Sequence, residues 1–291
     1  MTRQELIDSI RKKKSYLCIG LDTDLAKIPR WLRDEFEDPV FEFNRRIIDA
    51  TIDMVAAYKP NMAFYESQGS KGWRSLEKTM DYLNQHPQGL VFTIADAKRG
   101  DIGNSASYYA KAFFENMQFD SVTVNPYMGH DALQPFLSVP GKWAVVLALT
   151  SNPGAKDFQL WQPQLPMLLE KLGIKTEQWK RFYELIMEQC LQWGTPENMM
   201  FVVGATRPKM LQPIRESAPN HFFLVPGVGT QGGSLQEVSR QAMNSDCGLL
   251  INVSRNIIFA SKGRDFDQKA REVALAYQEE MEEILKEKKI I

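Results

Sequence analysis

Two aspartates and one lysine lie close together in the segment Val91–Ser105, which reads VFTIADAKRGDIGNS. Asp96 and Lys98 are two residues apart, so on a β-strand their side chains point to the same face, and Asp101 follows in the turn. Nearby negative charge keeps a lysine protonated, which suits it to give a proton to a carbanion and not to form a Schiff base. The cluster can also place negative charge beside a substrate carboxylate. The alternative is a structural ion pair between Asp96 and Lys98, with Asp101 at a helix N-terminus.

A second group of residues has the composition of an anion site. The segment Pro226–Leu235 reads PGVGTQGGSL, and Arg255 follows the next apolar run of the chain. Glycines let backbone N–H groups approach an anion, and a guanidinium can bind phosphate through two parallel hydrogen bonds. The pattern predicts a phosphate site. A tight loop that binds no ligand is the alternative.

Four further polar residues each follow a short apolar run: Asp22, Lys59, Asn125 and Ser151. The amide of Asn125 and the hydroxyl of Ser151 suit the carbonyl and imide edges of a heterocycle. Taken alone, each of the four is also an ordinary loop residue. The chain has 3 histidines and 3 widely separated cysteines, so we expect neither a metal site nor a disulfide framework.

Eight short apolar runs must position these polar residues, and helical patterns separate them. The runs are Tyr16–Leu21, Met54–Tyr58, Val91–Ala95, Ser121–Val124, Trp143–Leu149, Met200–Val203, Phe222–Val225 and Gly248–Ile251. Apolar strands that alternate with helices indicate a parallel sheet covered by helices. Eight units predict a closed (β/α)8 TIM barrel, with a doubly wound open sheet as the alternative. In such a barrel the active site lies at the C-terminal ends of the strands, where the polar residues collect.

The chain of 291 residues is predicted to form a single domain over its whole length, because it has no linker and no repeat. The segment 151–198 is longer than an ordinary connection. We interpret it as an elaborated loop after the fifth strand, with helices around Leu165–Leu172 and Thr176–Trp193. An amphipathic helix over Asp265–Lys288 is expected to pack on the outside of the barrel.

The charge and hydrophobicity of the sequence argue against nucleic-acid binding, membrane association and secretion. The formal net charge is −1, so no general field attracts nucleic acid or a membrane surface. The apolar runs are shorter than the ~20 residues needed to span a bilayer. The N-terminal segment lacks the apolar core of a signal peptide. We therefore expect a cytoplasmic protein.

These residues together resemble a known family. The segment Asp96-Ala-Lys98-Arg-Gly-Asp101-Ile-Gly looks like the signature of orotidine 5'-monophosphate decarboxylases. Further segments occur in the order of that family: Gly20-Leu-Asp22, Lys59-Pro-Asn, Asn125-Pro-Tyr-Met-Gly, Thr150-Ser-Asn-Pro-Gly and Pro226-Gly-Val-Gly-Thr-Gln-Gly-Gly. The match spans about residues 16–262, and the chain resembles the longer bacterial group. The resemblance implies decarboxylation of orotidine 5'-monophosphate to UMP and CO2, in the pyrimidine biosynthesis that makes UMP, without a metal or organic cofactor.

The resemblance also implies roles for the charged residues. Lys98 would protonate C6 as CO2 leaves, and Asp96 would lie beside the scissile carboxylate and hold Lys98. Asp101 would reach into the site of a neighbouring subunit, which implies a homodimer. Lys59 and Asp22 would bind ribose hydroxyls and complete the charged array.

Other residues would hold the substrate. By the same resemblance, Ser151 would contact the pyrimidine and Gln231 would bridge the base and the phosphate. Arg255 and backbone amides near Gly232 would bind the phosphate. Ser105 would contact the ribose across the dimer.

Asn125 is a further substrate contact that the resemblance implies. One departure from the family pattern is Ser254, because many members have glycine immediately before the phosphate-binding arginine. A serine there puts the local backbone conformation in question.

Two rival functions remain open on the residues. One is a Mg²⁺-dependent sugar-phosphate lyase or decarboxylase on a similar barrel, such as a 3-keto-gulonate phosphate decarboxylase or hexulose phosphate synthase. The other is a phosphate-binding barrel without catalytic activity. The presence of Lys59, Asp96, Lys98 and Asp101 together argues against the second rival.

Overall fold

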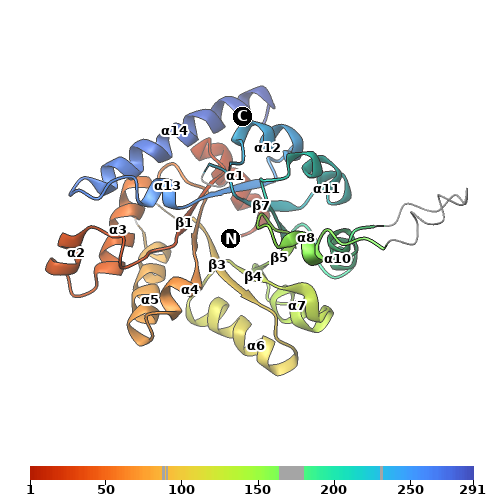
Figure 1. Cartoon of the computed structure of the whole chain (residues 1–291), viewed down its shortest axis with the longest axis horizontal. Helices are drawn as coiled ribbons and strands as arrows, with labels where there is room; N and C mark the ends of the chain where they lie inside the picture. Colours follow the sequence, from red (N-terminus) through yellow and green to blue (C-terminus); the bar gives the residue numbers. More distant parts are fainter. Residues whose placement is uncertain (87–88, 90, 164–179, 230–231) are drawn as a thin grey trace, which may run out of the picture.

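The structure is a computed structural model that describes residues 1–86, 89, 91–163, 180–229 and 232–291. Eight parallel strands close into a barrel in chain order, and β1 pairs with β8 through Leu17 and Ile251 (Figure 1). The strands are β1 (Leu17–Leu21), β2 (Ala57–Pro60), β3 (Phe92–Arg99), β4 (Ser121–Val124), β5 (Trp143–Leu149), β6 (Met199–Val203), β7 (Phe222–Pro226) and β8 (Leu249–Val253). The (β/α)8 barrel is therefore confirmed, and the open sheet is excluded by the β1–β8 pairing.

Helices surround the barrel and connect successive strands (Figure 1). The α-helices are α1 (Arg3–Lys13), α2 (Arg30–Glu35), α3 (Pro39–Thr51), α4 (Met62–Glu66), α5 (Ser70–Asn84), α6 (Gly103–Lys111), α7 (His130–Leu137), α8 (Ala155–Phe158), α10 (Phe182–Cys190), α11 (Leu211–Ser217), α12 (Leu235–Ala242), α13 (Arg255–Ile258) and α14 (Phe266–Glu287). The π-helix η1 (Ala112–Asn116) and the 3-10 helices η2 (Pro126–Met128) and η3 (Pro208–Met210) are short. No described helix has the length and apolar character that crossing a membrane requires.

The strands are buried, apart from the end of β3, because both of their faces are covered. Inside and outside the barrel they carry branched and aromatic side chains, and Trp143, Phe201 and Phe222 are fully buried. The helices bury only one side, as expected for an outer layer around the barrel. The helix α14, for example, buries Ala270 and Met281 and packs on α3. The helix expected over Asp265–Lys288 is thus confirmed.

The long connection after β5 differs in part from the sequence expectation. α8 follows β5 closely, and α10 begins at Phe182 and ends at Cys190, within the expected range Thr176–Trp193. Its later start has a local cause, because Arg181 is extended and its N–H donates to Glu184 Oε2 at 2.5 Å. The helix expected around Leu165–Leu172 lies outside the described residues.

β3 is longer than expected, and its end is irregular. The sequence predicts that the strand ends at Ala95, but it continues to Arg99. β3 pairs with β4 at Ala95↔Val122 and again at Arg99↔Val124, so β3 advances by four residues where β4 advances by two. The bulge contains Asp96 and Lys98, which places these charged residues in an irregular part of the sheet.

Candidate active site

Three charged side chains meet where β1, β2 and β3 end. Lys59 lies on β2, Asp96 lies on β3, and Asp22 directly follows β1. Lys59 Nζ is 2.8 Å from Asp96 Oδ2 and 3.8 Å from Asp22 Oδ1. The strand register fixes this meeting, because Gly20 pairs with Lys59 and a bridge joins Asn61 to Asp96. The structure therefore brings together three residues that the sequence placed at the mouth of the barrel.

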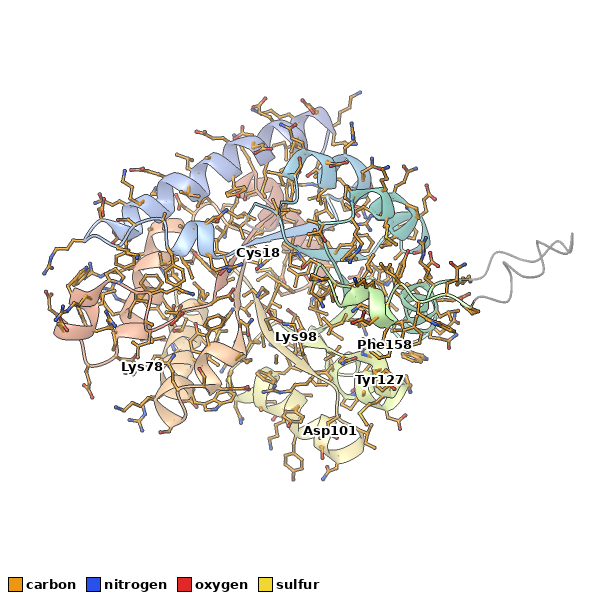
Figure 2. All side chains as sticks on the ribbon, in the orientation of Figure 1. Cys18, Lys78, Lys98, Asp101, Tyr127 and Phe158 are labelled. Carbon is orange, nitrogen blue, oxygen red and sulfur yellow. The ribbon has the colours of Figure 1, made fainter. Side chains whose placement is uncertain are left out.

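Lys98 joins the same cluster from the solvent side. Its Nζ lies 2.6 Å from Asp96 Oδ1, so one carboxylate holds two ammonium groups. Figure 2 shows Lys98 near the centre of the view, inside the ring of helices. The expectation that Asp96 and Lys98 share one face is confirmed. Asp96 and Lys59 are almost enclosed, whereas Lys98 remains open to solvent.

The electrostatics of the cluster favour the charged forms. Burial acts against the charge on Lys59, but Asp96 and Asp22 outweigh it and raise the pKa of this ammonium. Burial also acts against the charge on Asp96, yet Lys59 and Lys98 outweigh it and lower the pKa of this carboxyl well below its usual range. At neutral pH the enclosed part of the array is therefore a fully ionised pair.

Cys18, on β1 next to this array, has a different character. Burial raises the pKa of its thiol to about 12. Its Sγ lies 3.7 Å from Asn252 Oδ1, and the side chain is fully buried. Because the thiolate is the nucleophile, Cys18 is not suited to covalent catalysis at neutral pH.

One residue that contacts the array, Thr123 on β4, was not predicted from the sequence. Its Oγ1 lies 3.1 Å from Asp96 Oδ1 and accepts a hydrogen bond from the Lys98 N–H at 2.8 Å. The signal in the sequence is weak. Ser121 and Thr123 alternate with valines in an otherwise apolar run, which indicates only that one face of that strand carries hydroxyls.

Asp101 and Ser105 do not join the array within this chain. The Asp101 carboxylate accepts a hydrogen bond from the Ile102 N–H at 2.8 Å, just before α6. Figure 2 shows Asp101 beside α6, away from Lys98. Ser105 lies exposed on α6 itself. The resemblance implies that both act in the site of a partner subunit, and that expectation stays a prediction.

The glycine-rich loop after β7 is held by its own backbone. The Gly229 N–H donates to Gly233 O at 3.1 Å, and the Gly232 N–H donates to Gly229 O at 2.9 Å. Gly229 and Gly232 have φ of 77° and 86°, a region that side chains disfavour. Gln231 lies outside the described residues. A phosphate that accepts the Gly232 N–H must therefore compete with the carbonyl of Gly229.

Arg255 stands next to this loop. A Cβ on Gly229 would lie 2.8 Å from Nδ2 of Asn256, the residue after Arg255, so the loop and the start of α13 are in contact. Arg255 is exposed and its side chain has no hydrogen bond or ion pair within the part of the chain that the structure describes. Its guanidinium is therefore available to an anion.

The serine before Arg255 does not adopt the left-handed backbone that favours glycine. Ser254 has φ −120° and ψ −89°. Its hydroxyl donates to Gly20 O at 2.9 Å, and a Cβ on Gly20 would lie 2.7 Å from Ser254 Cβ. The absence of a side chain at Gly20 on β1 therefore leaves the space that the Ser254 side chain occupies. The same contact ties the end of β1, near Asp22, to the segment that carries Arg255.

Ser151 and Asn125 occupy the loops after β5 and β4. Ser151 packs against Gly204, where a Cβ would lie 2.7 Å from Ser151 Cα. Asn125 caps η2, because its Oδ1 accepts the Tyr127 N–H at 3.0 Å. The local role of Asn125 is therefore visible, and a contact of either residue with substrate stays a prediction.

Residues 15–270 of the sequence match a family described as "Orotidine 5'-phosphate decarboxylase / HUMPS family". The chain belongs to this family. An orotidine 5'-phosphate decarboxylase of Flavobacterium johnsoniae is 53% identical over 288 residues, which cover 99% of this chain and 100% of that protein.

Solved structures of this family have the same fold. The Leishmania donovani OMP decarboxylase is 34% identical with a TM-score of 0.75, and the match covers 96% of this chain and 99% of that chain. The Leishmania donovani UMP synthase is also 34% identical with a TM-score of 0.76, and the match covers 96% of this chain and 57% of that chain. These likenesses extend over nearly the whole (β/α)8 barrel of this family member.

Proposed function

We propose that this protein catalyses the decarboxylation of orotidine 5'-monophosphate to UMP and CO2, the last step of de novo UMP synthesis. The observation that carries the proposal is the placement of Lys98 Nζ at 2.6 Å from Asp96 Oδ1 at the open end of a barrel of this family. The sugar-phosphate lyase and the non-catalytic barrel are not favoured, since relatives of about 50% identity over the full chain are named orotidine 5'-phosphate decarboxylases.

The reaction asks the protein to stabilise a carbanion. When the C6 carboxylate leaves as CO2, its bonding electron pair stays on C6, and Lys98 gives the proton that forms UMP. The uncatalysed step is slow enough to require on the order of 20 kcal/mol of stabilisation from the enzyme. A fixed ammonium next to C6 supplies part of it, because its charge is in place before the carbanion develops. Asp96 holds this ammonium and lies beside the leaving carboxylate.

Asp22 and Lys59 are proposed to bind the ribose hydroxyls of the substrate. Asp22 Oδ1 is buried and has no hydrogen-bond partner among the described residues, and its ion pair with Lys59 is long, at 3.8 Å. A buried carboxylate oxygen without a donor is costly, so a ribose hydroxyl that donates to it would gain binding energy. This energy, together with that of the phosphate, is what organises the array around the reacting carbon.

The remaining contacts divide between base and phosphate. Arg255 and the backbone near Gly232 bind the phosphate, Gln231 bridges phosphate and base, and Ser151 contacts the pyrimidine. The exposed guanidinium of Arg255, which no side chain of the described residues engages, supports this assignment. Asn125 is a further substrate contact, on the loop after β4.

The complete site is proposed to need a homodimer. Asp101 and Ser105 lie on the outer side of the chain and reach the partner's site, so each site takes Lys98 from one subunit and Asp101 from the other. Exposed apolar side chains near them, Ile102 and Tyr108, support a covered surface at α6. Residues 1–291 are proposed to form one structural unit that works in the cytoplasm without a metal or organic cofactor.

The test is the absorbance change of orotidine 5'-monophosphate when pure protein is added, with and without EDTA. Decarboxylation at the same rate in both is expected. Turnover that stops with EDTA and returns with Mg²⁺ would support the sugar-phosphate lyase class. Tight binding of UMP without any turnover would support the non-catalytic barrel.

A further inference from the structure

We propose that Thr123 is a positioning residue for the proton donor, because its one hydroxyl fixes both the backbone of Lys98 and the carboxylate of Asp96. The inference rests on the proposed decarboxylation and deepens it. Thr123 lies on β4, contacts no reacting atom in the proposed mechanism, and is 1% exposed.

The bulge in β3 creates the need for such a residue. Between the pairs Ala95↔Val122 and Arg99↔Val124, β4 offers a single residue, Thr123, opposite the extra residues of β3. Regular ladder bonding cannot satisfy every backbone group of the bulge. The Thr123 hydroxyl takes the place of a backbone carbonyl by accepting the Lys98 N–H at 2.8 Å.

The backbone of Lys98 also needs to be held. Its φ is 48°, in the left-handed region that a lysine rarely adopts. A backbone conformation of this kind persists only where several surrounding contacts hold it in place. It occurs often at functional sites. This backbone conformation helps to set the direction of the Lys98 side chain, so a bond that fixes the Lys98 N–H also restricts where the ammonium can lie.

The single proton of the hydroxyl has two candidate acceptors. Asp96 Oδ1 is 3.1 Å from Thr123 Oγ1, and Ala95 O is 3.4 Å away. The shorter contact ends on an ionised carboxylate, and charge-assisted bonds are the stronger kind. The proton therefore goes to Asp96, and the hydroxyl connects the carboxylate to the backbone of the lysine that this carboxylate holds.

The experiment replaces the hydroxyl and keeps the shape. Thr123→Val is expected to lower kcat by about 10- to 100-fold with KM changed less than about threefold, because small misplacement of a reacting group has effects of that size. Thr123→Ser keeps the hydroxyl and is expected to restore kcat to within about threefold of wild type. Thr123→Ala is the substitute if the valine variant does not fold, and thermal unfolding checks each variant.

Ser121→Ala is the matched control. Ser121 lies two residues earlier on the same strand, is fully buried, and donates its hydroxyl to Thr93 O at 3.1 Å, outside the array. It is expected to keep wild-type kcat. A wild-type kcat in Thr123→Val, or equal losses of kcat in Thr123→Val and Ser121→Ala, would overturn the inference. Wild-type protein that does not turn over orotidine 5'-monophosphate would instead refute the proposed function, so the two failures are distinguishable.

Discussion

Lys59 and Asp96 form an almost buried ion pair, with Lys59 Nζ 2.8 Å from Asp96 Oδ2. This pair uses one oxygen of the carboxylate and leaves Oδ1 for Lys98. The arrangement separates two tasks. The inner ammonium neutralises and orients the carboxylate, and the outer ammonium is left at the open face, where a substrate carbon can reach it.

The first prediction concerns the outer ammonium. Lys98→Ala is expected to lower kcat for orotidine 5'-monophosphate by at least about 10⁴-fold, because it removes both the proton donor and the charge that stabilises the carbanion. UMP binding is expected to weaken far less. The measurements are single-turnover absorbance for the reaction and calorimetry for UMP.

Lys78→Ala is the control for this prediction. Its side chain is 47% exposed and its Nζ lies 3.0 Å from Asp38, whereas Lys98 is 52% exposed and lies 2.6 Å from Asp96. The two lysines thus share exposure and an aspartate partner, but Lys78 lies on α5, away from the array (Figure 2). Lys78→Ala is expected to keep wild-type kcat. Near wild-type turnover by Lys98→Ala would remove the proposed role of Lys98.

The second prediction concerns the inner pair. Asp96→Ala leaves the buried Lys59 ammonium with Asp22 at 3.8 Å as its remaining ion-pair partner in the described chain. Breaking a buried pair by removing one partner typically costs about 3–5 kcal/mol, so Asp96→Ala should lower the free energy of unfolding by about that amount. Urea denaturation at pH 7 measures it. The double variant Lys59→Met/Asp96→Ala should recover part of the loss, and a double variant less stable than Asp96→Ala would contradict this explanation.

Much of this site could be predicted from the sequence. Asp22, Lys59 and Asp96 each follow or end an apolar run, and parallel strands of a barrel bring such positions to one face. The pattern therefore placed them at the same end of the barrel, and the family resemblance joined Asp22 and Lys59 to the charged array. The left-handed backbone of Lys98 and the contact of Thr123 could not be predicted, because both depend on the register between β3 and β4. A single sequence gives no signal for a bulge that does not contain glycine or proline.

The third prediction tests the shared site. If Asp101 acts on the partner's Lys98, the variants Lys98→Ala and Asp101→Ala should each be nearly inactive. Unfolded together and refolded as an equal mixture, they should regain about a quarter of wild-type activity, since half of the dimers are mixed and each mixed dimer has one intact site of two.

Two comparisons control this experiment. Each variant refolded alone should stay inactive, and a mixture of Lys98→Ala with Asp96→Ala should regain nothing, because those two residues lie in the same chain at 2.6 Å. Absence of recovery in the Lys98→Ala and Asp101→Ala mixture, with dimers demonstrated by sedimentation, would contradict a site shared in this way.

The last prediction concerns acid stability, which depends on a group far from the chemistry. His221 lies just before β7, is 6% exposed, and neither of its ring nitrogens has a hydrogen-bond partner among the described residues. Burial, with the nearby charges of Arg215 and Arg3, lowers the pKa of His221 to about 4 from 6.5. The unfolded chain therefore binds this proton below about pH 6.5, whereas the folded chain does so only near pH 4, so stability falls as the pH decreases between these values.

The expected loss at pH 4 is about 3 kcal/mol, from 1.36 kcal/mol for each unit of pKa difference. Urea denaturation between pH 7 and pH 4 should show it in the wild type. His221→Phe keeps an aromatic ring beside Phe201, whose centroid is 5.7 Å from that of His221, and removes the titrating group. Its stability should therefore decline less over the same range. Parallel curves for the two proteins would show that His221 does not carry this pH dependence.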